Sequence, residues 1–276
     1  MNKILSKAVS SIYWLIVFSI VFVQCKGKDD SSDSSNLHAA KIIKSVLFIG
    51  NSYTYYNDLE MIVAHLASAD TVYSLYTEKT AVGSYTLIEH SVRPETILAI
   101  KSRKWDLIVL QEMSTLPITN LSEFSDGAKK MDQIIKETRP DFNGLIFYLT
   151  WGRKDVASET SMTSRGITTF NQMQDALTSA YLKVGQERSA EVAPVGIAWQ
   201  KVRSSYDSQI NLYDSDGTHP SFAGSYLTAC VFYASICDRS PIGNIYKETL
   251  SQNVADILQR KAYEAYLEYK GKGYLK

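Results

Sequence analysis

Short apolar runs alternate with longer amphipathic segments along most of this chain, and no other feature of the sequence constrains the fold as strongly. The apolar runs predict β-strands, and the segments between them have the periodicity of helices that bury one face. Strands that alternate with helices form a parallel sheet covered on both faces. The sequence therefore predicts an α/β fold with three layers, α/β/α, in a flavodoxin-like order around a mostly parallel sheet of about five strands.

The predicted elements follow one another without a repeat or an internal linker. The strands are expected near 46–49, 72–76, 107–110, 145–150 and 192–195. The helices are expected near 58–69, 94–103, 122–138, 165–187, 221–237 and 246–269. A chain of 276 residues with 45% hydrophobic side chains can bury the core of one large domain. Its 29 basic residues balance its 29 acidic residues, which argues against nucleic acid as the main partner.

The first residues have the pattern of an export signal. Lys3 and Lys7 precede an apolar stretch that is too short for a membrane span and typical of a signal peptide, which we place at 1–24. The polar, low-complexity stretch at 25–40 predicts a flexible linker. The remaining residues, 41–276, are expected to form one catalytic domain.

Cys25 directly follows the apolar stretch, and this start resembles that of a bacterial lipoprotein, although Phe22 and Gln24 depart from the usual pattern. The resemblance implies lipidation at Cys25, with contact to the membrane only through that anchor. It places the protein at the outer membrane or cell surface, and a periplasmic or secreted protein is the alternative. The other two cysteines, Cys230 and Cys237, lie in one predicted helix about 10 Å apart, which predicts reduced core residues.

A serine follows the first predicted strand where the chain turns into a loop. The apolar run at 45–49 ends in Gly50, Asn51 and Ser52. The carboxyl ends of strands in an open α/β sheet bound the crevice in which ligands bind, so the Ser52 hydroxyl is expected to face substrate as a nucleophile. An ordinary turn is the alternative, because Gly and Asn tolerate left-handed backbone and Ser caps helices.

Among the four histidines, His219 is the candidate general base. His38 lies in the linker, and His65 lies inside a predicted amphipathic helix, where a structural role is expected. Pro220 suits the first turn of the next helix and so holds His219 in the preceding loop. Asp216 lies three residues earlier, and one tight turn can bring its carboxylate to the imidazole.

A structural role would make the block at 216–220 a turn followed by a helix cap. Taken with Ser52, however, the block resembles the SGNH (GDSL-like) hydrolase superfamily, in which a serine block and an Asp-x-x-His block occur in this order. The resemblance covers roughly 44–238 and implies a flavodoxin-like α/β/α hydrolase. It implies that Ser52 is the nucleophile, His219 the general base and Asp216 the carboxylate that orients the base.

The resemblance also implies an oxyanion hole with three donors. The backbone N–H of Ser52 is the first, and Gly83, after the second strand, is expected to supply another backbone N–H. Where the family usually has Gly-x-Asn-Asp after the third strand, this chain has Leu-Gln-Glu-Met-Ser at 110–114, which resembles a branch of SGNH-like domains. Gln111 is then expected to supply the side-chain amide on a longer stem, which puts rate and substrate geometry in question more than reaction class.

Further residues are expected near the same crevice. Glu112 and Ser114 follow the third strand and could orient Gln111 or contact substrate. His90 could also face the crevice, although a core or surface role is expected for it. Aromatic side chains at the strand ends could stack on sugar rings, although ordinary packing is expected for most of them. They are Tyr53, Tyr55, Tyr56, Tyr85 and Trp151.

The sequence predicts a serine esterase that removes small acyl groups, O-acetyl in particular, from carbohydrate outside the cytoplasm. The export signal and the aromatic loops favour a small ester or acylated glycan as substrate. A lipase or thioesterase is the enzymatic alternative, and the chain has no long apolar lid that would favour it. From another class, a surface glycan-binding protein could use an SGNH scaffold weakened at Gln111. No cofactor is implied, and the scattered histidines argue against a metal.

Overall fold

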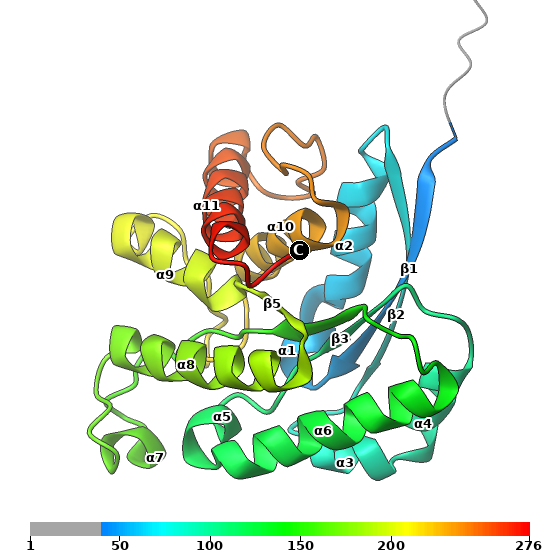
Figure 1. The fold of residues 1–276 in the computed structure, drawn as a ribbon. Helices are drawn as coiled ribbons and strands as arrows, with labels where there is room; N and C mark the ends of the chain where they lie inside the picture. Colours follow the sequence, from blue (N-terminus) through cyan, green and yellow to red (C-terminus); the bar gives the residue numbers. More distant parts are fainter. Residues whose placement is uncertain (1–39) are drawn as a thin grey trace, which may run out of the picture. The chain divides into compact units, whose positions relative to one another are not determined.

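A parallel sheet forms the middle of the structure, a computed structural model that describes residues 40–276. The predicted signal peptide, the lipidation site at Cys25 and nearly all of the predicted linker lie outside the described residues. The sheet has the strand order β2-β1-β3-β4-β5, and all neighbouring strands are parallel, as predicted (Figure 1). The strands are β1 (Ile42–Gly50), β2 (Tyr73–Ala81), β3 (Leu107–Leu110), β4 (Leu145–Tyr148) and β5 (Glu191–Ala193).

The side chains of β1 alternate between two hydrophobic cores, one on each face of the sheet. Val46 and Phe48 belong to one core, and Leu47 and Ile49 belong to the other. All four are fully buried. Successive side chains of a strand point to opposite faces, so a strand covered on both sides must be apolar throughout. This requirement is why the strand was recognisable in the sequence.

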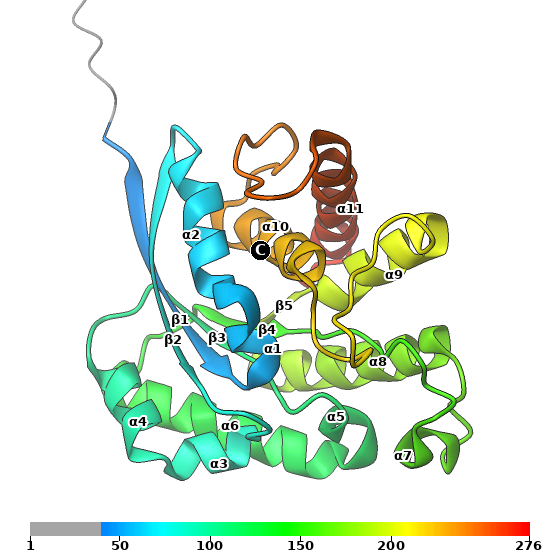
Figure 2. The ribbon, with the colours of Figure 1, turned by 180° about the vertical axis from the view of Figure 1, so that it is seen from behind.

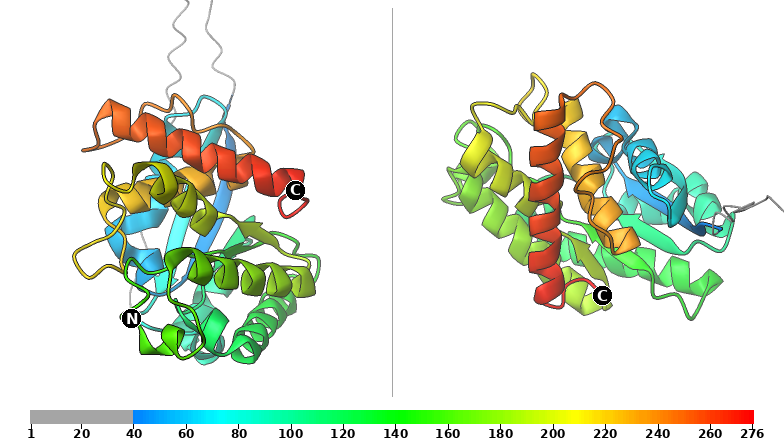
Figure 3. Two further views of the ribbon diagram at one scale, coloured as in Figure 1. Left: turned by 90° about the vertical axis from the view of Figure 1, so that its left-hand side faces the viewer. Right: turned by 90° about the horizontal axis from the view of Figure 1, so that it is seen from above.

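Helices cover both faces of the sheet and complete the three predicted layers (Figures 1 and 3). The first face is covered by α2 (Leu59–Ser68), α9 (Val195–Tyr206), α10 (Phe222–Cys237) and α11 (Gln252–Gly271). The second face is covered by α3 (Leu87–Val92), α4 (Pro94–Lys101), α6 (Leu121–Thr138) and α8 (Phe170–Arg188). Four short helices are α1 (Ser52–Tyr55), η1 (Tyr56–Asp58), α5 (Leu116–Thr119) and α7 (Thr160–Thr163).

Several elements differ from the prediction, including α3, which was not predicted, and α11, which begins at Gln252 and not near 246. Three further differences have clear physical reasons. β2 continues through the polar stretch 77–80, because it is an edge strand and needs no continuous apolar run. The fourth predicted helix begins only at Phe170, where Thr169 and Gln172 form a capping box. Helix α9 was not predicted, because it follows Pro194 directly and its first residues are as apolar as the strand before it.

Cys230 and Cys237 are buried, free thiols in α10, as their spacing predicted. Burial raises the pKa of both thiols, so they stay protonated and pack as small apolar residues.

Within residues 40–276, none of the helices combines the length and apolar character that a bilayer span requires. The same residues contain no cluster of three or more His, Cys, Asp or Glu side chains placed to hold a metal ion.

Candidate active site

The candidate site begins where β1 gives way to α1, at the carboxyl edge of the sheet (Figure 2). Asn51 caps α1, and its side-chain oxygen accepts a hydrogen bond from the backbone N–H of Tyr53 at 3.4 Å. Ser52 is the first residue of the helix and is partly exposed. The N–H groups of a first helical turn have no partner within the helix, so the Ser52 N–H can bind a ligand.

Gln111 is fully buried behind this loop and holds it in place. Its side-chain oxygen accepts hydrogen bonds from the Asn51 N–H at 2.8 Å and from the Thr54 hydroxyl at 2.9 Å. Its side-chain nitrogen donates to Asn51 Oδ1 at 2.9 Å and to the backbone carbonyl of Glu112 at 2.5 Å. A backbone N–H can only donate, so the atom of Gln111 that faces the Asn51 nitrogen must be the amide oxygen.

This arrangement differs from the oxyanion role expected for Gln111. The side-chain amide has two hydrogens, and both are used inside the protein, so none is directed at a substrate. The packing also explains Gly50, because a Cβ atom there would lie 2.4 Å from both Gln111 Oε1 and Thr54 Oγ1. Gln111 therefore positions the loop that carries Ser52.

The loop before α10 brings Asp216 and His219 together, as their spacing predicted. Asp216 Oδ1 accepts the backbone N–H groups of Thr218 and His219, each at 2.9 Å. Asp216 Oδ2 lies 2.5 Å from His219 Nδ1. Desolvation acts to raise the pKa of Asp216, but the hydrogen bonds from the His219 side chain and the two N–H groups outweigh it and hold the pKa below its usual value. Gly217 adopts φ +69° in this turn, a conformation that favours glycine.

The segment that starts at Ser52 packs directly against the His219 loop. The Tyr56 ring stacks on the imidazole of His219 with centroids 4.2 Å apart and planes within 9°. The Tyr53 hydroxyl forms a 2.7 Å hydrogen bond with Thr218 Oγ1. In the described part of the chain, no hydrogen bond joins Ser52 Oγ to His219, and such bonds often form only with substrate bound. Asp216 holds Nδ1 of the imidazole, which leaves Nε2 for a reacting group.

A stack of buried aromatic rings packs beneath the surface of the site, on the protein side of Tyr53. Tyr53 stacks on Trp151 at 4.4 Å, and Trp151 stacks on Trp199 at 3.9 Å. Trp151 also donates from Nε1 to the carbonyl of Thr218 at 3.0 Å. Tyr53 and Trp151 are buried, so their faces serve packing, the role expected for most of these aromatic residues, and are not open to a sugar ring. Tyr55 and Tyr56 keep exposed surface beside the site.

Gly83 lies in the turn after β2, next to the Ser52 loop. The neighbouring Val82 N–H donates to the Gly50 carbonyl at 3.1 Å, and Asn51 Nδ2 donates to the Tyr85 carbonyl at 2.9 Å. A Cβ atom at Gly83 would lie 3.4 Å from the Tyr55 hydroxyl. Within residues 40–276, the backbone N–H of Gly83 has no hydrogen-bond acceptor. The structure thus places this N–H near the amino end of α1.

His90 and Glu112 are fully buried, so His90 has the core role that was expected over a place in the crevice, and the expectation that Glu112 lines the crevice is wrong. The His90 ring is held between Thr96 Oγ1 and the Gly50 carbonyl, each at 2.8 Å, and burial lowers its pKa. The Glu112 carboxyl accepts the Leu87 N–H at 3.2 Å, at the start of α3, and burial raises its pKa to about 8. Both side chains stabilise backbone at the strand ends.

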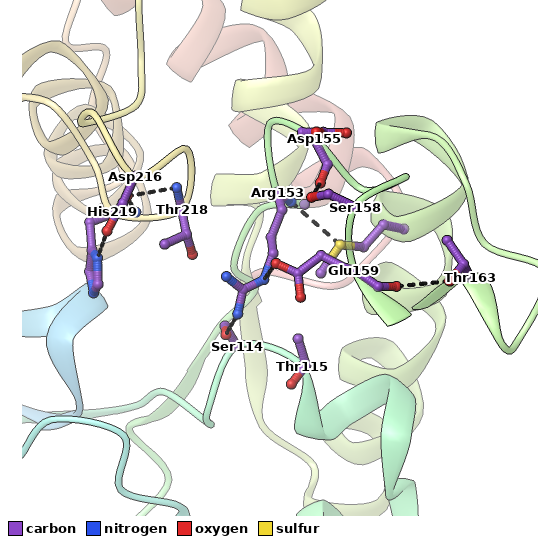
Figure 4. A network of polar contacts seen from close by, with 12 residues as sticks. Ser114, Thr115, Arg153, Asp155, Ser158, Glu159, Thr163, Asp216, Thr218 and His219 are labelled. Atoms are coloured by element: carbon purple, nitrogen blue, oxygen red, sulfur yellow. Dashed lines mark hydrogen bonds and ion pairs between the residues drawn. The ribbon is translucent and has the colours of Figure 1, made fainter. Parts of the chain in front are cut away.

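Ser114 is partly exposed and contacts Arg153, which the sequence analysis did not single out. Arg153 follows β4, and its Nη2 atom donates to Ser114 Oγ at 3.4 Å (Figure 4). Its Nε atom lies 3.3 Å from a carboxylate oxygen of Glu159. In the sequence, only the position of Arg153 just after a predicted strand indicated that it could lie near the site, because the carboxyl ends of parallel strands meet at this edge of the sheet.

This arrangement of layers and strands is that of the SGNH hydrolases. A protein from Slackia heliotrinireducens described as a candidate SGNH hydrolase matches with a TM-score of 0.57 and 25% identity, over 71% of this chain and 100% of that chain. A candidate GDSL-like lipase from Parabacteroides merdae matches with a TM-score of 0.50 and 15% identity, over 70% and 95% of the two chains. The second likeness shows the fold alone.

The chain belongs to the family described as a domain of unknown function, DUF4886, whose model matches residues 28–265. A DUF4886 family protein from Bacteroides uniformis has a similar structure, with a TM-score of 0.71 and 20% identity. The similarity covers 82% of this chain and 95% of that chain. No functionally curated protein matches the chain.

Proposed function

We propose that this protein is a serine esterase that removes small acyl groups, O-acetyl in particular, from carbohydrate outside the cytoplasm. The observation that carries the proposal is the Asp216–His219 pair, packed against the segment that begins with Ser52. A serine hydroxyl reacts only when a base takes its proton, and an imidazole oriented by a carboxylate is such a base. The SGNH hydrolase fold and the likeness to the candidate SGNH hydrolase support the same reaction class.

In the proposed mechanism, Ser52 Oγ attacks the carbonyl carbon of the ester while His219 Nε2 takes its proton. Asp216 stays ionised and stabilises the imidazolium through Nδ1. The tetrahedral intermediate collapses, the bond to the alkoxy oxygen breaks, and His219 gives its proton to the leaving sugar hydroxyl. A water molecule, deprotonated by His219, then attacks the acyl-Ser52 ester. Collapse of this second intermediate releases acetate and returns the proton to Ser52.

Two backbone N–H groups stabilise the negative oxygen in this mechanism. The Ser52 N–H belongs to the first turn of α1, and the Gly83 N–H lies in the adjacent turn. Backbone donors fixed before the reaction need no reorganisation as charge develops, which makes them effective in oxyanion holes. Gln111 contributes indirectly, because its hydrogen bonds fix the loop that presents Ser52.

The export signal supports the proposed location and substrate. We place the protein at the outer membrane or cell surface, attached through lipidated Cys25, where acylated polysaccharides are accessible substrates. The exposed ring of Tyr55 and the partly exposed ring of Tyr56, whose one face stacks on His219, can contact a sugar beside the site.

A glycan-binding protein on the same scaffold is the second candidate, and one observation favours it. Both amide hydrogens of Gln111 are used internally, so the site has no side-chain amide donor from this block. Loss of one oxyanion donor typically lowers turnover by roughly 10² to 10³. A protein with this site could bind an acylated glycan and turn it over slowly.

A hydrolysis screen separates the two candidates. The purified protein is assayed with acetylated oligosaccharides and short aryl esters, with Ser52→Ala as the inactive variant and Ser68→Ala, at the exposed end of α2, as the matched control. The esterase predicts acetate release that Ser68→Ala retains and Ser52→Ala loses by several orders of magnitude. Binding of the oligosaccharides without acetate release would favour the glycan-binding protein.

A further inference from the structure

Arg153 follows β4 at the carboxyl edge of the sheet, where Ser52 also lies. Glu159 lies 3.3 Å from its Nε atom, and Ser114 accepts a hydrogen bond from Nη2 at 3.4 Å. The Arg153 side chain is 23% exposed, so most of it is packed against protein. Among the described residues, no hydrogen bond or ion pair involves Nη1. In Figure 4 the guanidinium group faces the side on which Asp216 and His219 lie.

The backbone next to Arg153 ties it to the histidine loop. The N–H of Lys154 donates to the carbonyl of Gly217 at 2.9 Å, two residues before His219. The Tyr53 hydroxyl, which forms a hydrogen bond with Thr218, also lies near Arg153. Burial raises the pKa of Tyr53, and the positive charge of Arg153 opposes this rise. Arg153 therefore lies beside the residues that follow Ser52 and precede His219.

Charged side chains of both signs lie around the site. Arg153, the exposed Lys154 and the exposed Asp155 lie after β4, whereas Asp214 and Asp216 lie on the histidine loop. Glu159 offsets part of the positive charge as an ion-pair partner, while the buried Nε atom of Arg153 has no hydrogen-bond partner among the described residues. A guanidinium presents its N–H groups as a planar fork, which matches the two oxygens of a carboxylate. Asp155 and Glu159 balance the charges of Lys154 and Arg153, so an anion on this side would be bound by the Arg153 guanidinium itself and not by an excess of positive charge.

We propose that Arg153 binds a carboxylate on the substrate, so that the ester hydrolysed here is carried by an acidic sugar such as a uronic acid. This inference rests on the proposed esterase function and names its substrate class. Ser114 and Glu159 are the positioning residues for Arg153, and Nη1 with the free hydrogen of Nη2 forms the binding edge.

Two matched substrates test the inference. One is methyl glucuronoside with a single O-acetyl group, and the other is methyl glucoside acetylated at the same hydroxyl, so that they differ only in the carboxylate. The wild-type protein should show a higher kcat/KM for the acidic substrate. Arg153→Gln should lower the ratio of acidic to neutral kcat/KM by about tenfold or more, through KM, because charge-assisted hydrogen bonds are lost. Arg153→Lys should recover part of the ratio.

Arg165→Gln is the matched control, because Arg165 is an exposed arginine after α7, and this variant should keep the wild-type ratio. A ratio that Arg153→Gln leaves unchanged, with both substrates slowed equally, would overturn the inference. Neutral-ester hydrolysis that needs Ser52 would still uphold the esterase in that case. If neither ester is hydrolysed, calorimetric titration with methyl glucuronoside decides: binding that Arg153→Gln abolishes supports the carboxylate site, and no binding to the wild type refutes it.

Discussion

Gln111 Oε1 accepts the backbone N–H of Asn51 at 2.8 Å, so the residue expected to hold the oxyanion instead holds the loop of the proposed nucleophile. Four hydrogen bonds connect this one buried side chain to Asn51, Thr54 and Glu112. A buried amide with all its partners inside the protein acts mainly on stability and position. The proposed site is thus built on a rigid connection between the ends of β1 and β3.

Gln111→Ala should destabilise the protein by roughly 2–4 kcal/mol, because it leaves the Asn51 N–H without a partner and opens a cavity. Gln111→Glu should also destabilise it, since a carboxylate cannot donate to Asn51 Oδ1 or the Glu112 carbonyl. Chemical denaturation measures both effects, with the exposed Gln133→Ala as control. Unchanged stability together with a selective loss of kcat would instead make Gln111 a direct donor to substrate.

Asp216→Asn should lower kcat by about 10⁴ with the fold retained, because an amide at this position no longer holds the imidazole in the reactive tautomer. Acetyl-ester kinetics measure the effect. Asp214→Asn is the matched control, since Asp214 is exposed and its backbone N–H still bonds the His219 carbonyl. Equal activity of the two variants would remove Asp216 from the mechanism.

Gly83→Pro should lower kcat by roughly 10² to 10³ with little change in KM, because proline has no N–H to donate to the oxyanion. Gly83→Ala keeps the N–H, and its Cβ would lie 3.4 Å from the Tyr55 hydroxyl, an ordinary contact. It should therefore keep most of the activity. Thermal melting of both variants checks the fold, and full activity of a folded Gly83→Pro would rule out this donor.

The buried carboxyl of Glu112 should make stability depend on pH. Burial raises its pKa to about 8 in the folded protein, so its contribution is fully present below the unfolded pKa of about 4.5 and is lost as pH rises through about 8. Glu112→Gln keeps an oxygen that can accept the Leu87 and Met113 N–H groups. This variant should lose less stability between pH 5 and pH 8 than the wild type, by up to about 1.4 kcal/mol per pH unit. Parallel pH profiles of the two proteins, measured by chemical denaturation, would contradict this.

The sequence was sufficient for the sheet and for the contact between Asp216 and His219, because these depend on local patterns. The β1 run is apolar on both faces, and the Asp216 contact closes within three residues. The positions and hydrogen bonds of other polar side chains depend on partners that are distant in the sequence. His90 bonds the Gly50 carbonyl across 40 residues, and Gln111 bonds Asn51 across 60 residues, and neither contact has a sequence signal.

Arg153 shows a second limit of the sequence. Its partners Ser114 and Glu159 come from different parts of the chain, and only the fold brings them to one edge of the sheet. A single arginine after an apolar run has no spacing that predicts a ligand. Its orientation toward the histidine loop became evident only from the side-chain arrangement in Figure 4.

Labelling with a fluorophosphonate, which reacts covalently with activated serine hydroxyls, tests the central claim most directly. The proposed mechanism predicts one adduct on the folded wild-type protein, mapped by peptide mass spectrometry to Ser52 and lost in both Ser52→Ala and His219→Ala. Absence of any adduct on the folded protein, or an adduct that persists in Ser52→Ala, would contradict the assignment of Ser52 as the nucleophile.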